Sequence, residues 1–347
     1  EGDATGFSRA LWRQMAALGW VGMLLPEGDD DEAAGGLAEL AVVLEAAGRC
    51  LAPEPFLSTS LLAGLALRYG GTPAQRERWL PAIASGEAIG TLALSEPQSR
   101  HARTSVRTRA VQDGDGYRVT GEKIQVLDGH AADFLLIPAR VAGGDEDRAG
   151  ITLLLVEAGA PGLKITRQVR VDSRSAALVS LADVTVAADA VVGTPGAAAE
   201  LLDPVLDRAT VGLAAEMLGA MTQAFEDTVA YLKERKQFGV VIGSFQALKH
   251  RAARLFIEIS LARAAVSAAA RAADVAPARL PALASLAKAR CSEALLHVAE
   301  EGVQLFGGVG MTDEYDIGFY LKRARAAEQT LGDAAWHRAR WAALAGY

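Results

Sequence analysis

Three long alanine-rich segments dominate the C-terminal part of this 347-residue sequence and narrow the folds open to it. Apolar residues recur at helical spacing throughout residues 201–233, 245–274 and 280–306. A shorter segment with a similar pattern ends the chain. Three long helices and a short one predict an antiparallel four-helix bundle.

The composition upstream of the bundle changes near Ile89. Before that residue, helical patterns alternate with turn signals, whereas β-branched residues and short turns dominate from there to about residue 192. A glycine-containing linker then leads into the bundle. The sequence therefore predicts a mainly α fold with a central β domain. The predicted domains are an N-terminal helical domain (1–88), a middle β domain (89–195) and a C-terminal helical bundle (196–347).

Turn and capping residues predict several element boundaries. Gly19 is placed to end a first helix, and Thr72 with Pro73 to begin another. The run Asp113-Gly114-Asp115-Gly116 predicts a β-hairpin. Further strands are predicted at 134–137, 151–156 and 178–181, and a solvated acidic loop at 27–32.

Composition and charge argue against several classes of function. The net charge of −7 disfavours a nucleic-acid partner, because neutralising phosphates requires a basic surface. No apolar run approaches the roughly 20 residues that span a bilayer, so we expect no membrane insertion. Cys50 and Cys291 have neither a metal-ligand spacing nor a disulfide framework, and the reducing cytoplasm is the expected location.

Two motifs in the C-terminal part point to a nucleotide ligand. The first is Arg235-Lys236-Gln237-Phe238-Gly239, followed shortly by Phe245, and the second runs from Gln304 through Gly307 and Gly308 to Tyr315. Taken singly, each has an ordinary structural explanation, as a helix C-terminus with cations in its last turn or a glycine turn after a helix. In combination they suit a nucleotide. Arginine pairs with diphosphate, phenylalanine packs on a flat ring, and glycines let backbone N–H groups approach phosphates.

In this order, the two motifs resemble the C-terminal signature of flavin-dependent acyl-CoA dehydrogenases, and the resemblance extends over nearly the whole chain. Ser95-Glu96-Pro97 resembles the Thr-Glu-Pro entry to that family's β domain. The resemblance implies an N-terminal helical domain, a β-barrel-like middle domain and a four-helix bundle, usually assembled as a tetramer. It also implies α,β-dehydrogenation of an acyl-CoA, in which a Glu carboxylate abstracts a proton and FAD accepts a hydride. The residues implied to hold the adenine-pyrophosphate half of FAD are Arg235, Gln237, Phe238, Phe245, Gln304, Gly307 and Gly308.

The positions that the resemblance assigns to the reactive ring of FAD depart from the family pattern. After Ser95-Glu96-Pro97, Gln98-Ser99-Arg100-His101 replaces a glycine-rich Gly-Ser-Asp stretch. Gln125 stands where the family has a Trp that covers the flavin. Leu127 stands where a Thr or Ser hydroxyl hydrogen-bonds near N5. Glutamine cannot stack equivalently, and leucine has no donor.

The catalytic base is absent from both places where the resemblance would put it. Leu331 occupies the Glu position in the last part of the bundle, and Ala209 occupies the alternative position on the first bundle helix. Asp333 is a weak candidate for a displaced base, because it lies two residues from the expected position. We expect Asp333 and three other nearby carboxylates, Asp207, Glu216 and Glu328, to be solvated or capping residues. A solvated helix face is likewise expected for Arg323 and Arg325 in preference to a CoA phosphate site.

These departures lead to the hypothesis of a subunit without its own base. In the family, one subunit surrounds the flavin ring while its neighbour contributes the two motifs to the adenine-pyrophosphate half. This chain resembles the base-lacking subunit of actinobacterial heteromeric (α2β2) steroid side-chain acyl-CoA dehydrogenases. The implied partner is an acyl-CoA dehydrogenase subunit with an intact ring site and a Glu base. The implied substrate is an acyl-CoA, with a steroid side-chain CoA as one candidate, and the implied electron acceptor is an electron-transfer flavoprotein.

Two alternatives stay open on the sequence alone. One is a self-sufficient homo-oligomeric dehydrogenase that uses Asp333 as its base. The other is a flavin-free acyl-CoA-binding scaffold, although such a scaffold would need neither adenine-side motif. The acyl group itself is not specified by any residue.

Overall fold

The computed structural model describes residues 4–26 and 33–347, and internal contacts divide the chain into two compact units. Unit 1 comprises Glu1–Gly36 and Pro53–Ala209, and unit 2 comprises Leu37–Ala52 and Thr210–Tyr347. The acidic loop expected at 27–32 lies outside the described residues. The order of helical, β and helical segments along the chain agrees with the prediction, whereas the exact three-domain boundaries stay a prediction.

The capping signals of unit 1 are confirmed. Helix α1 (Arg9–Ala17) begins after Ser8, whose side chain accepts a hydrogen bond from the backbone of Leu11 at 3.2 Å. It ends before Gly19, which has φ +78°. Helix α4 (Pro73–Ala84) begins at Thr72, with a reciprocal capping box to Gln75.

The sequence patterns did not predict the segment between these helices. A π-helix, η1 (Phe56–Gly64), runs directly into α3 (Leu65–Gly70), and all nine of its residues are buried. Its polar residues Ser58, Thr59 and Ser60 interrupt the apolar periodicity on which helix prediction depends. Two of them find acceptors outside the helix, because Ser58 Oγ donates to Asp128 and Thr59 Oγ1 donates to the carbonyl of Gly90 at 3.0 Å.

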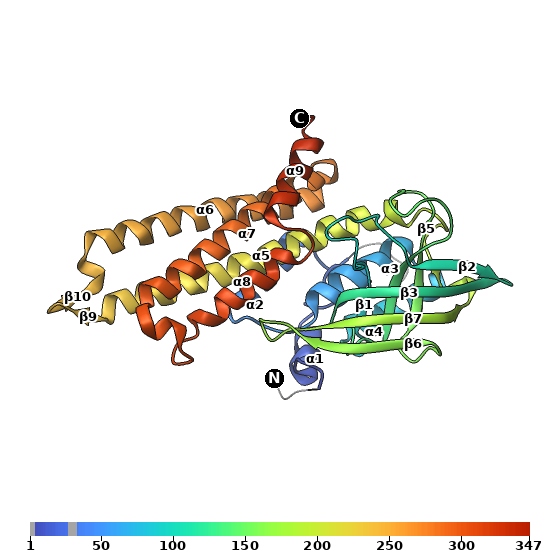
Figure 1. The fold of residues 1–347 in the computed structure, drawn as a ribbon, viewed down its shortest axis with the longest axis horizontal. Coiled ribbons are helices and arrows are strands. Elements are labelled where there is room, and N and C mark those ends of the chain that lie inside the picture. The colour runs from blue at the N-terminus through green and yellow to red at the C-terminus, as the bar shows by residue number, and fades with distance from the viewer. Residues whose placement is uncertain (1–3, 27–32) are drawn as a thin grey trace. The chain divides into compact units, whose positions relative to one another are not determined.

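Unit 1 also contains an eight-stranded mixed sheet (Figure 1). The strand order is β6-β7-β3-β2-β4-β5-β8, and β1 pairs with β4 in parallel. The expected hairpin is confirmed, since Asp113 pairs with Gly116 at the β2–β3 turn. The strands are β1 (Gly90–Leu92), β2 (Arg109–Asp113), β3 (Gly116–Leu127), β4 (Phe134–Arg140), β5 (Ile151–Glu157), β6 (Leu163–Val169), β7 (Ser175–Val186) and β8 (Val191–Val192).

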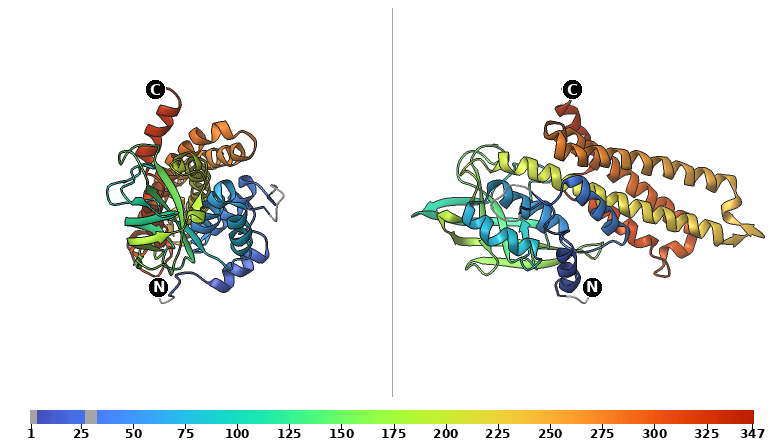
Figure 2. Two further views of the ribbon diagram at one scale, coloured as in Figure 1. Left: turned by 90° about the vertical axis from the view of Figure 1, so that its right-hand side faces the viewer. Right: turned by 180° about the vertical axis from the view of Figure 1, so that it is seen from behind.

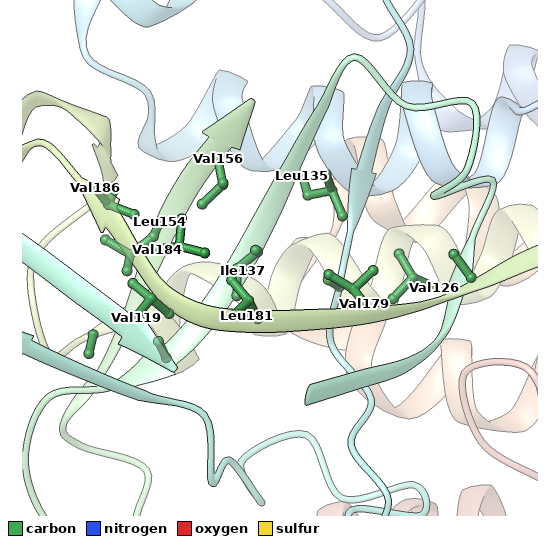
Figure 3. Packing of buried hydrophobic residues seen from close by; sticks show 14 residues of the cluster. Val119, Val126, Leu135, Ile137, Leu154, Val156, Val179, Leu181, Val184 and Val186 are labelled. Atoms are coloured by element: carbon green, nitrogen blue, oxygen red, sulfur yellow. The ribbon is translucent and has the colours of Figure 1, made fainter. Parts of the chain in front are cut away.

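The core of the sheet is formed by aliphatic side chains from its central strands. Figure 3 shows Val119 and Val126 of β3, Leu135 and Ile137 of β4, and Val179 of β7 among this cluster. Most of the cluster is fully buried. The β-branched residues that indicated strands in the sequence therefore also supply the packing that stabilises them.

Unit 2 is a helical bundle. Helix α5 (Ala198–Glu234) enters it at Thr210, and α6 (Gln246–Val275) and α7 (Leu280–Phe306) run alongside each other (Figure 2). Helix α2 (Leu37–Arg49) also packs on α6. The three long helices fall within a few residues of the predicted ranges, because their long apolar stripes are strong signals.

The chain end differs from the prediction of one short helix. Two helices follow, α8 (Ile317–Gln329) and α9 (Ala334–Leu344). The turn between them has left-handed or related backbone at Leu331 (φ +58°) and Gly332 (φ +110°), which no continuous helix accommodates. Asp333 then starts α9 as its N-cap.

Candidate functional site

The Arg235–Gly239 motif of unit 2 forms a projecting hairpin. Strands β9 (Lys236–Gln237) and β10 (Val240–Val241) pair across a two-residue turn at Phe238 (φ +55°) and Gly239 (φ +79°). Two successive positive φ values are those of a type I′ turn. The simpler expectation of a helix that stops at Gly239 is therefore wrong, since α5 already ends at Glu234.

This hairpin leaves its functional groups exposed. Phe238 is 90% exposed, which is unusual for a large aromatic side chain, and its ring lies edge-on to that of Phe245 at a centroid distance of 6.2 Å. Arg235 is exposed and forms no ion pair within residues 4–26 and 33–347. The exposed Gln237 amide only donates to the neighbouring carbonyl of Lys236 at 2.9 Å. A guanidinium, an amide and two aromatic rings are thus available to a ligand.

The glycine-rich motif is held at the same end of the bundle by aromatic packing. Tyr231 lies in the last turn of α5, four residues before Arg235. Its ring stacks on that of Phe306, at the end of α7, with a centroid distance of 4.2 Å. Its hydroxyl donates to the carbonyl of Phe306 at 3.2 Å, and Tyr315 packs edge-on against both rings. Two motifs about 70 residues apart in sequence are therefore brought together.

The glycines of that motif face open space. Gly307 (φ +71°) ends α7, and a Cβ added at Gly307 or Gly308 would meet no atom within 4 Å. Both glycines and Gln304 are exposed. Backbone N–H groups without side chains around them can approach an anion closely. Together with Arg235 and Gln237, this set fits the adenine-pyrophosphate half of FAD, with a cation for the phosphates and rings for the adenine.

The residues expected beside the flavin ring, Gln125 and Leu127, belong to unit 1 and lie at the C-terminal end of β3. The register of β3 with β7 shifts between Lys123 and Val126, so a bulge places Gln125 (φ +52°) outside regular pairing. Gln125 is exposed and Leu127 is half-buried. Neither side chain offers an aromatic face, and Leu127 has no hydrogen-bond donor. These residues do not fit the flavin ring in the way the family pattern requires.

The loop after Ser95-Glu96-Pro97 is anchored by a buried ion pair. Lys123 Nζ donates to Glu96 Oε1 at 2.7 Å and to the carbonyl of Pro138 at 2.7 Å. The backbone N–H groups of Arg107 and Thr108 also donate to the Glu96 carboxylate, at 2.7 and 3.1 Å. Burial opposes ionisation of Glu96, but the Lys123 charge and these hydrogen bonds outweigh it and lower the pKa of Glu96 to about 2.

One cationic residue of the same loop, Arg103, is held by two ion pairs. Arg103 pairs with Asp207 at 2.8 Å and with Asp203 at 3.3 Å, both on the first turns of α5 within unit 1. Gln98 donates to Glu96 at 2.8 Å. In the stretch that replaces the family's glycines, Gln98 is therefore engaged within the protein, whereas Arg100 is exposed. Asp207 is a buried ion-pair partner, so the expectation that it is solvated or capping is wrong.

Asp128, directly after Leu127, is a charged group that the sequence patterns did not single out. Its carboxylate accepts a hydrogen bond from Ser58 Oγ of the π-helix at 2.6 Å. Burial raises its pKa, although the Ser58 hydrogen bond and the nearby Arg174 charge act in the opposite direction. The end of β3 is thus fastened to η1, a helix type that recurs at functional sites.

The positions expected for the base carry no proton acceptor. Ala209 is fully buried, and Leu331 is an apolar residue in the left-handed region. Asp333 accepts a hydrogen bond from the backbone N–H of Trp336 at 2.7 Å, as the N-cap of α9. Glu328 lies 3.8 Å from Arg325, whose side chain is exposed as expected. Capping was the expected role of Asp333, and the geometry agrees with it.

Two expectations about unit 2 are corrected. Glu216 and Arg323 are neither solvated nor directed at a phosphate, because they form a buried ion pair at 2.9 Å. Arg323 also donates to the carbonyl of Leu51 at 3.2 Å. Burial of both charges is tolerated because each is the other's partner.

A buried lysine that the sequence patterns missed holds the Leu331 turn. Lys288 Nζ donates to Gly332 O at 2.7 Å, to Glu328 O at 3.0 Å and to Ser292 Oγ at 3.1 Å. Burial lowers its pKa to about 8. His337 Nε2 lies 3.0 Å from the Leu331 carbonyl on the other side. The sequence did contain a sign of this buried lysine, because Lys288 lies on the otherwise apolar stripe of α7, between Ala284 and Cys291.

Residues 4–26 and 33–347 contain no group of three or more His, Cys, Asp or Glu side chains that could hold a metal ion. In the same part of the chain, no helix is long and apolar enough to cross a membrane. Cys50 and Cys291 are free thiols.

Comparison with known proteins identifies matches over almost the entire chain. Three family models match: the acyl-CoA dehydrogenase N-terminal domain over residues 1–87, the middle domain over 91–184 and the C-terminal domain over 201–344. The acyl-CoA dehydrogenase IpdE2 of Mycobacterium tuberculosis is 33% identical over 327 residues, which cover 94% of this chain and 83% of that protein.

Among solved structures, two whose names each join two proteins are similar. The Tcur3481–Tcur3483 steroid ACAD variant has a TM-score of 0.87 and 34% identity, covering 99% of this chain and 90% of that chain. The ChsE4–ChsE5 complex from Mycobacterium tuberculosis has a TM-score of 0.86 and 30% identity, covering 98% of this chain and 89% of that chain.

Proposed function

Because this chain belongs to the acyl-CoA dehydrogenase family, we propose that it is the base-lacking subunit of a heteromeric, FAD-dependent acyl-CoA dehydrogenase. In this proposal it donates the adenine-pyrophosphate half of the FAD site, and a catalytic partner subunit supplies the flavin-ring site and a Glu base. FAD, when bound, supplies the hydride acceptor for α,β-dehydrogenation. Family membership implies an FAD-linked oxidoreductase. The assignment of the two halves of the FAD site to two different subunits is the proposal.

The main observation behind the proposal is the group of exposed residues at one end of unit 2. Arg235, Phe238 and Gly308 are all exposed, and the guanidinium of Arg235 is not consumed by a carboxylate within the described residues. A projecting hairpin with a 90% exposed Phe is costly to maintain in water. It is understandable as the part of the site that a cofactor and a second chain cover. In this role, Arg235 binds the diphosphate, Phe238 and Phe245 pack on the adenine, and the glycines admit the phosphates.

The state of the ring side supports assigning the chemistry to the partner. Leu127 offers no donor, and Gln125 offers no aromatic face. The neighbouring loop is fixed by Glu96–Lys123 and Arg103–Asp207, so small shifts of flexible side chains would not open a flavin-ring site. A homo-oligomer of this chain would therefore bind one end of FAD and leave the reactive ring poorly supported.

The arrangement around Asp333 weighs against the self-sufficient alternative. Its carboxylate is engaged as a helix cap at 2.7 Å, and the turn before it is held by Lys288 and His337. Bringing Asp333 to a substrate would require breaking these contacts. The scaffold alternative is disfavoured by the intact adenine-side set, which acyl-CoA binding alone does not need.

The substrate and remaining partners follow from the similar proteins. A steroid ACAD and the ChsE4–ChsE5 complex are among the similar solved structures, so we extend the proposal to a steroid side-chain acyl-CoA. An electron-transfer flavoprotein is the proposed electron acceptor, and the cytoplasm is the proposed location. The segments 1–88, 89–195 and 196–347 remain the proposed domains.

Flavin stoichiometry tests the proposal directly. The chain is purified alone and after co-expression with a candidate partner, an acyl-CoA dehydrogenase subunit that has an intact flavin-ring site and a Glu base, and bound FAD is measured by absorbance. Little FAD on the chain alone, with one FAD per pair of different chains, is the expected result. One FAD per chain in a homo-oligomer that dehydrogenates acyl-CoA unaided would overturn the proposal.

A further inference from the structure

Tyr231 lies outside the Arg235–Gly239 motif but is bonded to both motifs of the candidate site. Its carbonyl accepts the backbone N–H of Arg235 at 2.9 Å. Its ring stacks on that of Phe306 with an interplanar angle of 16°, and its hydroxyl donates to the Phe306 carbonyl. One residue therefore joins the end of α5 to the start of the glycine turn.

The rings of Tyr231, Phe306 and Tyr315 form a closed aromatic cluster. Tyr315 lies 5.5 Å from Tyr231 and 5.0 Å from Phe306 between ring centroids, with interplanar angles of 80° and 64°. Edge-to-face contacts of this kind are a preferred arrangement of aromatic rings. Phe306 precedes the two glycines and Tyr315 ends the motif, so the cluster holds the glycine-rich segment on both sides.

The Tyr231 hydroxyl fixes the peptide plane at which the glycine turn begins. The carbonyl of Phe306 and the N–H of Gly307 belong to one planar trans peptide and point in opposite directions. The carbonyl accepts the Tyr231 hydrogen bond, and the N–H donates to the carbonyl of Gln304. Both sides of this peptide are therefore held. Because Gly307 then turns at φ +71°, the direction of the chain after it depends on this plane.

Close packing around the last turns of α5 brings these groups within reach of one another. A Cβ added at Gly302 of α7 would lie 3.1 Å from Thr228 Oγ1 of α5, closer than an ordinary van der Waals contact. The chain that returns from the β9–β10 hairpin approaches the same part of α5, since a Cβ at Gly243 would lie 2.6 Å from the Leu232 carbonyl. Both motifs are therefore attached to the bundle around Tyr231.

We propose that Tyr231 is a positioning residue for the nucleotide site, which holds the Gly307–Gly308 turn where one diphosphate can contact both this turn and Arg235. This inference rests on the proposed function, because FAD is the ligand of the site. Tyr231 acts through the turn and does not itself touch the cofactor. Without the hydroxyl, the turn must become ordered when FAD binds, and that ordering weakens the affinity.

The FAD affinity of the heteromer tests this role. The chain is co-expressed with the candidate partner subunit, and the complex is stripped of FAD and titrated with it. Tyr231→Phe keeps the stacked ring and removes only the hydroxyl, so the dissociation constant of FAD should rise roughly three- to tenfold. A dissociation constant equal to that of the wild type would overturn the inference.

Tyr320→Phe is the matched control. The Tyr320 hydroxyl, on α8, donates to the carbonyl of Arg49 on α2 at 2.8 Å, so it also joins two helices of unit 2 through a backbone carbonyl. Tyr231→Phe and Tyr320→Phe should lower the melting temperature by similar amounts, and only Tyr231→Phe should weaken FAD binding. Equal losses of FAD affinity from both variants would show a general effect of stability and would contradict positioning.

A double-mutant cycle shows whether Tyr231 acts through the turn. The loss of affinity from Tyr231→Phe should shrink when Gly307→Ala has already altered the turn. In combination with Phe245→Leu, in the other motif, the two losses should instead multiply. Losses that multiply in both combinations would refute action through the turn.

Hydrogen exchange of the full chain alone gives a measurement that needs neither FAD nor a partner. In Tyr231→Phe, the amides of residues 304–312 should exchange roughly threefold or more faster than in the wild type, because the turn opens more often. Tyr320→Phe should leave them unchanged. Unchanged exchange in Tyr231→Phe would show that the hydroxyl does not hold the turn and would overturn the inference.

Arg235→Ala distinguishes failure of this inference from failure of the proposed function. If Arg235→Ala weakens FAD binding and Tyr231→Phe does not, the proposed function stands and Tyr231 has no positioning role. If neither variant changes the FAD affinity, the two motifs do not bind the cofactor, and both the proposed function and this inference are overturned.

Discussion

The two regions assigned to opposite halves of one cofactor differ in how their polar groups are used. At the ring-side region of unit 1, Glu96, Lys123 and Arg103 are buried or nearly so and are bonded to one another or to neighbouring groups. At the adenine-side region of unit 2, Arg235 and Phe238 are exposed. A site whose groups are satisfied internally contributes to stability, whereas one with exposed and unpaired groups is suited to binding. Substitutions in the two regions should therefore have opposite consequences.

The largest expected effect is on the stability of the ring-side region. Lys123→Met leaves the Glu96 carboxylate buried without its cation, which should lower the free energy of unfolding by about 3–5 kcal/mol. Urea denaturation of the full chain measures this loss. The double variant Glu96→Gln/Lys123→Met is the matched control and should recover a large part of it, since no uncompensated charge remains. Equal destabilisation in both variants would show that the charge pair is not the cause.

The same ion pair should govern acid unfolding. The pKa of Glu96 falls from its ordinary 4.5 to about 2 in the folded protein, so the unfolded state binds more protons between these values. The stabilisation is complete above pH 4.5 and is lost as the pH falls towards about 2. In Glu96→Gln, the free energy of unfolding should depend less steeply on pH over this interval.

The next largest effect is on cofactor affinity, with stability unchanged. Arg235→Ala removes a charge-assisted hydrogen bond to the diphosphate, worth roughly 1.5–3 kcal/mol, or about ten- to hundredfold in FAD affinity. Lys236→Ala, the adjacent exposed cation, is the control and should have little effect. FAD retained by the co-purified heteromer measures the difference, and equal losses from the two variants would contradict a specific role for Arg235.

Substitutions of Gly307 and Gly308 should have smaller effects on stability, and comparing them distinguishes backbone strain from contact with the ligand. Gly307→Ala should cost about 1 kcal/mol of stability, because its φ of +71° is unfavourable for a residue with a Cβ. Gly308→Ala has no such strain and no atom within 4 Å of the added Cβ, so it should leave the melting temperature unchanged. Both variants should nevertheless weaken FAD binding. If Gly308→Ala kept full FAD affinity, the turn would not be in contact with the cofactor.

The smallest effect concerns Asp333. Asparagine is also a good N-cap, so Asp333→Asn should change the free energy of unfolding by less than about 0.5 kcal/mol, whereas Asp333→Ala should lower it by about 1 kcal/mol. Turnover of acyl-CoA by the heteromer should be the same for the wild type and Asp333→Asn. Loss of turnover in Asp333→Asn, with the FAD content preserved, would instead establish a displaced base.

Much of the architecture follows from the sequence alone. The bundle helices have apolar stripes tens of residues long, and the hairpin at Asp113–Gly116 has a turn sequence that few alternatives satisfy, so both were predicted correctly. The candidate adenine-side residues also come from the sequence, because residue type and order carry that motif, and their role stays a prediction. Local patterns of this kind do not depend on distant parts of the chain.

Tertiary structure decided which of these groups are available. No local pattern distinguishes Arg235, which is exposed, from Arg323, which is buried against Glu216 more than 100 residues away. Nor does it reveal that Lys288 holds the turn at Leu331, or that Phe238 lies on a hairpin instead of at a helix end. Residue types and helical periodicity are properties of neighbouring positions, and they determined the family and the fold. Burial and pairing depend on segments distant in sequence that meet only in the folded chain, and they decided which charges stabilise the protein and which stay free to bind.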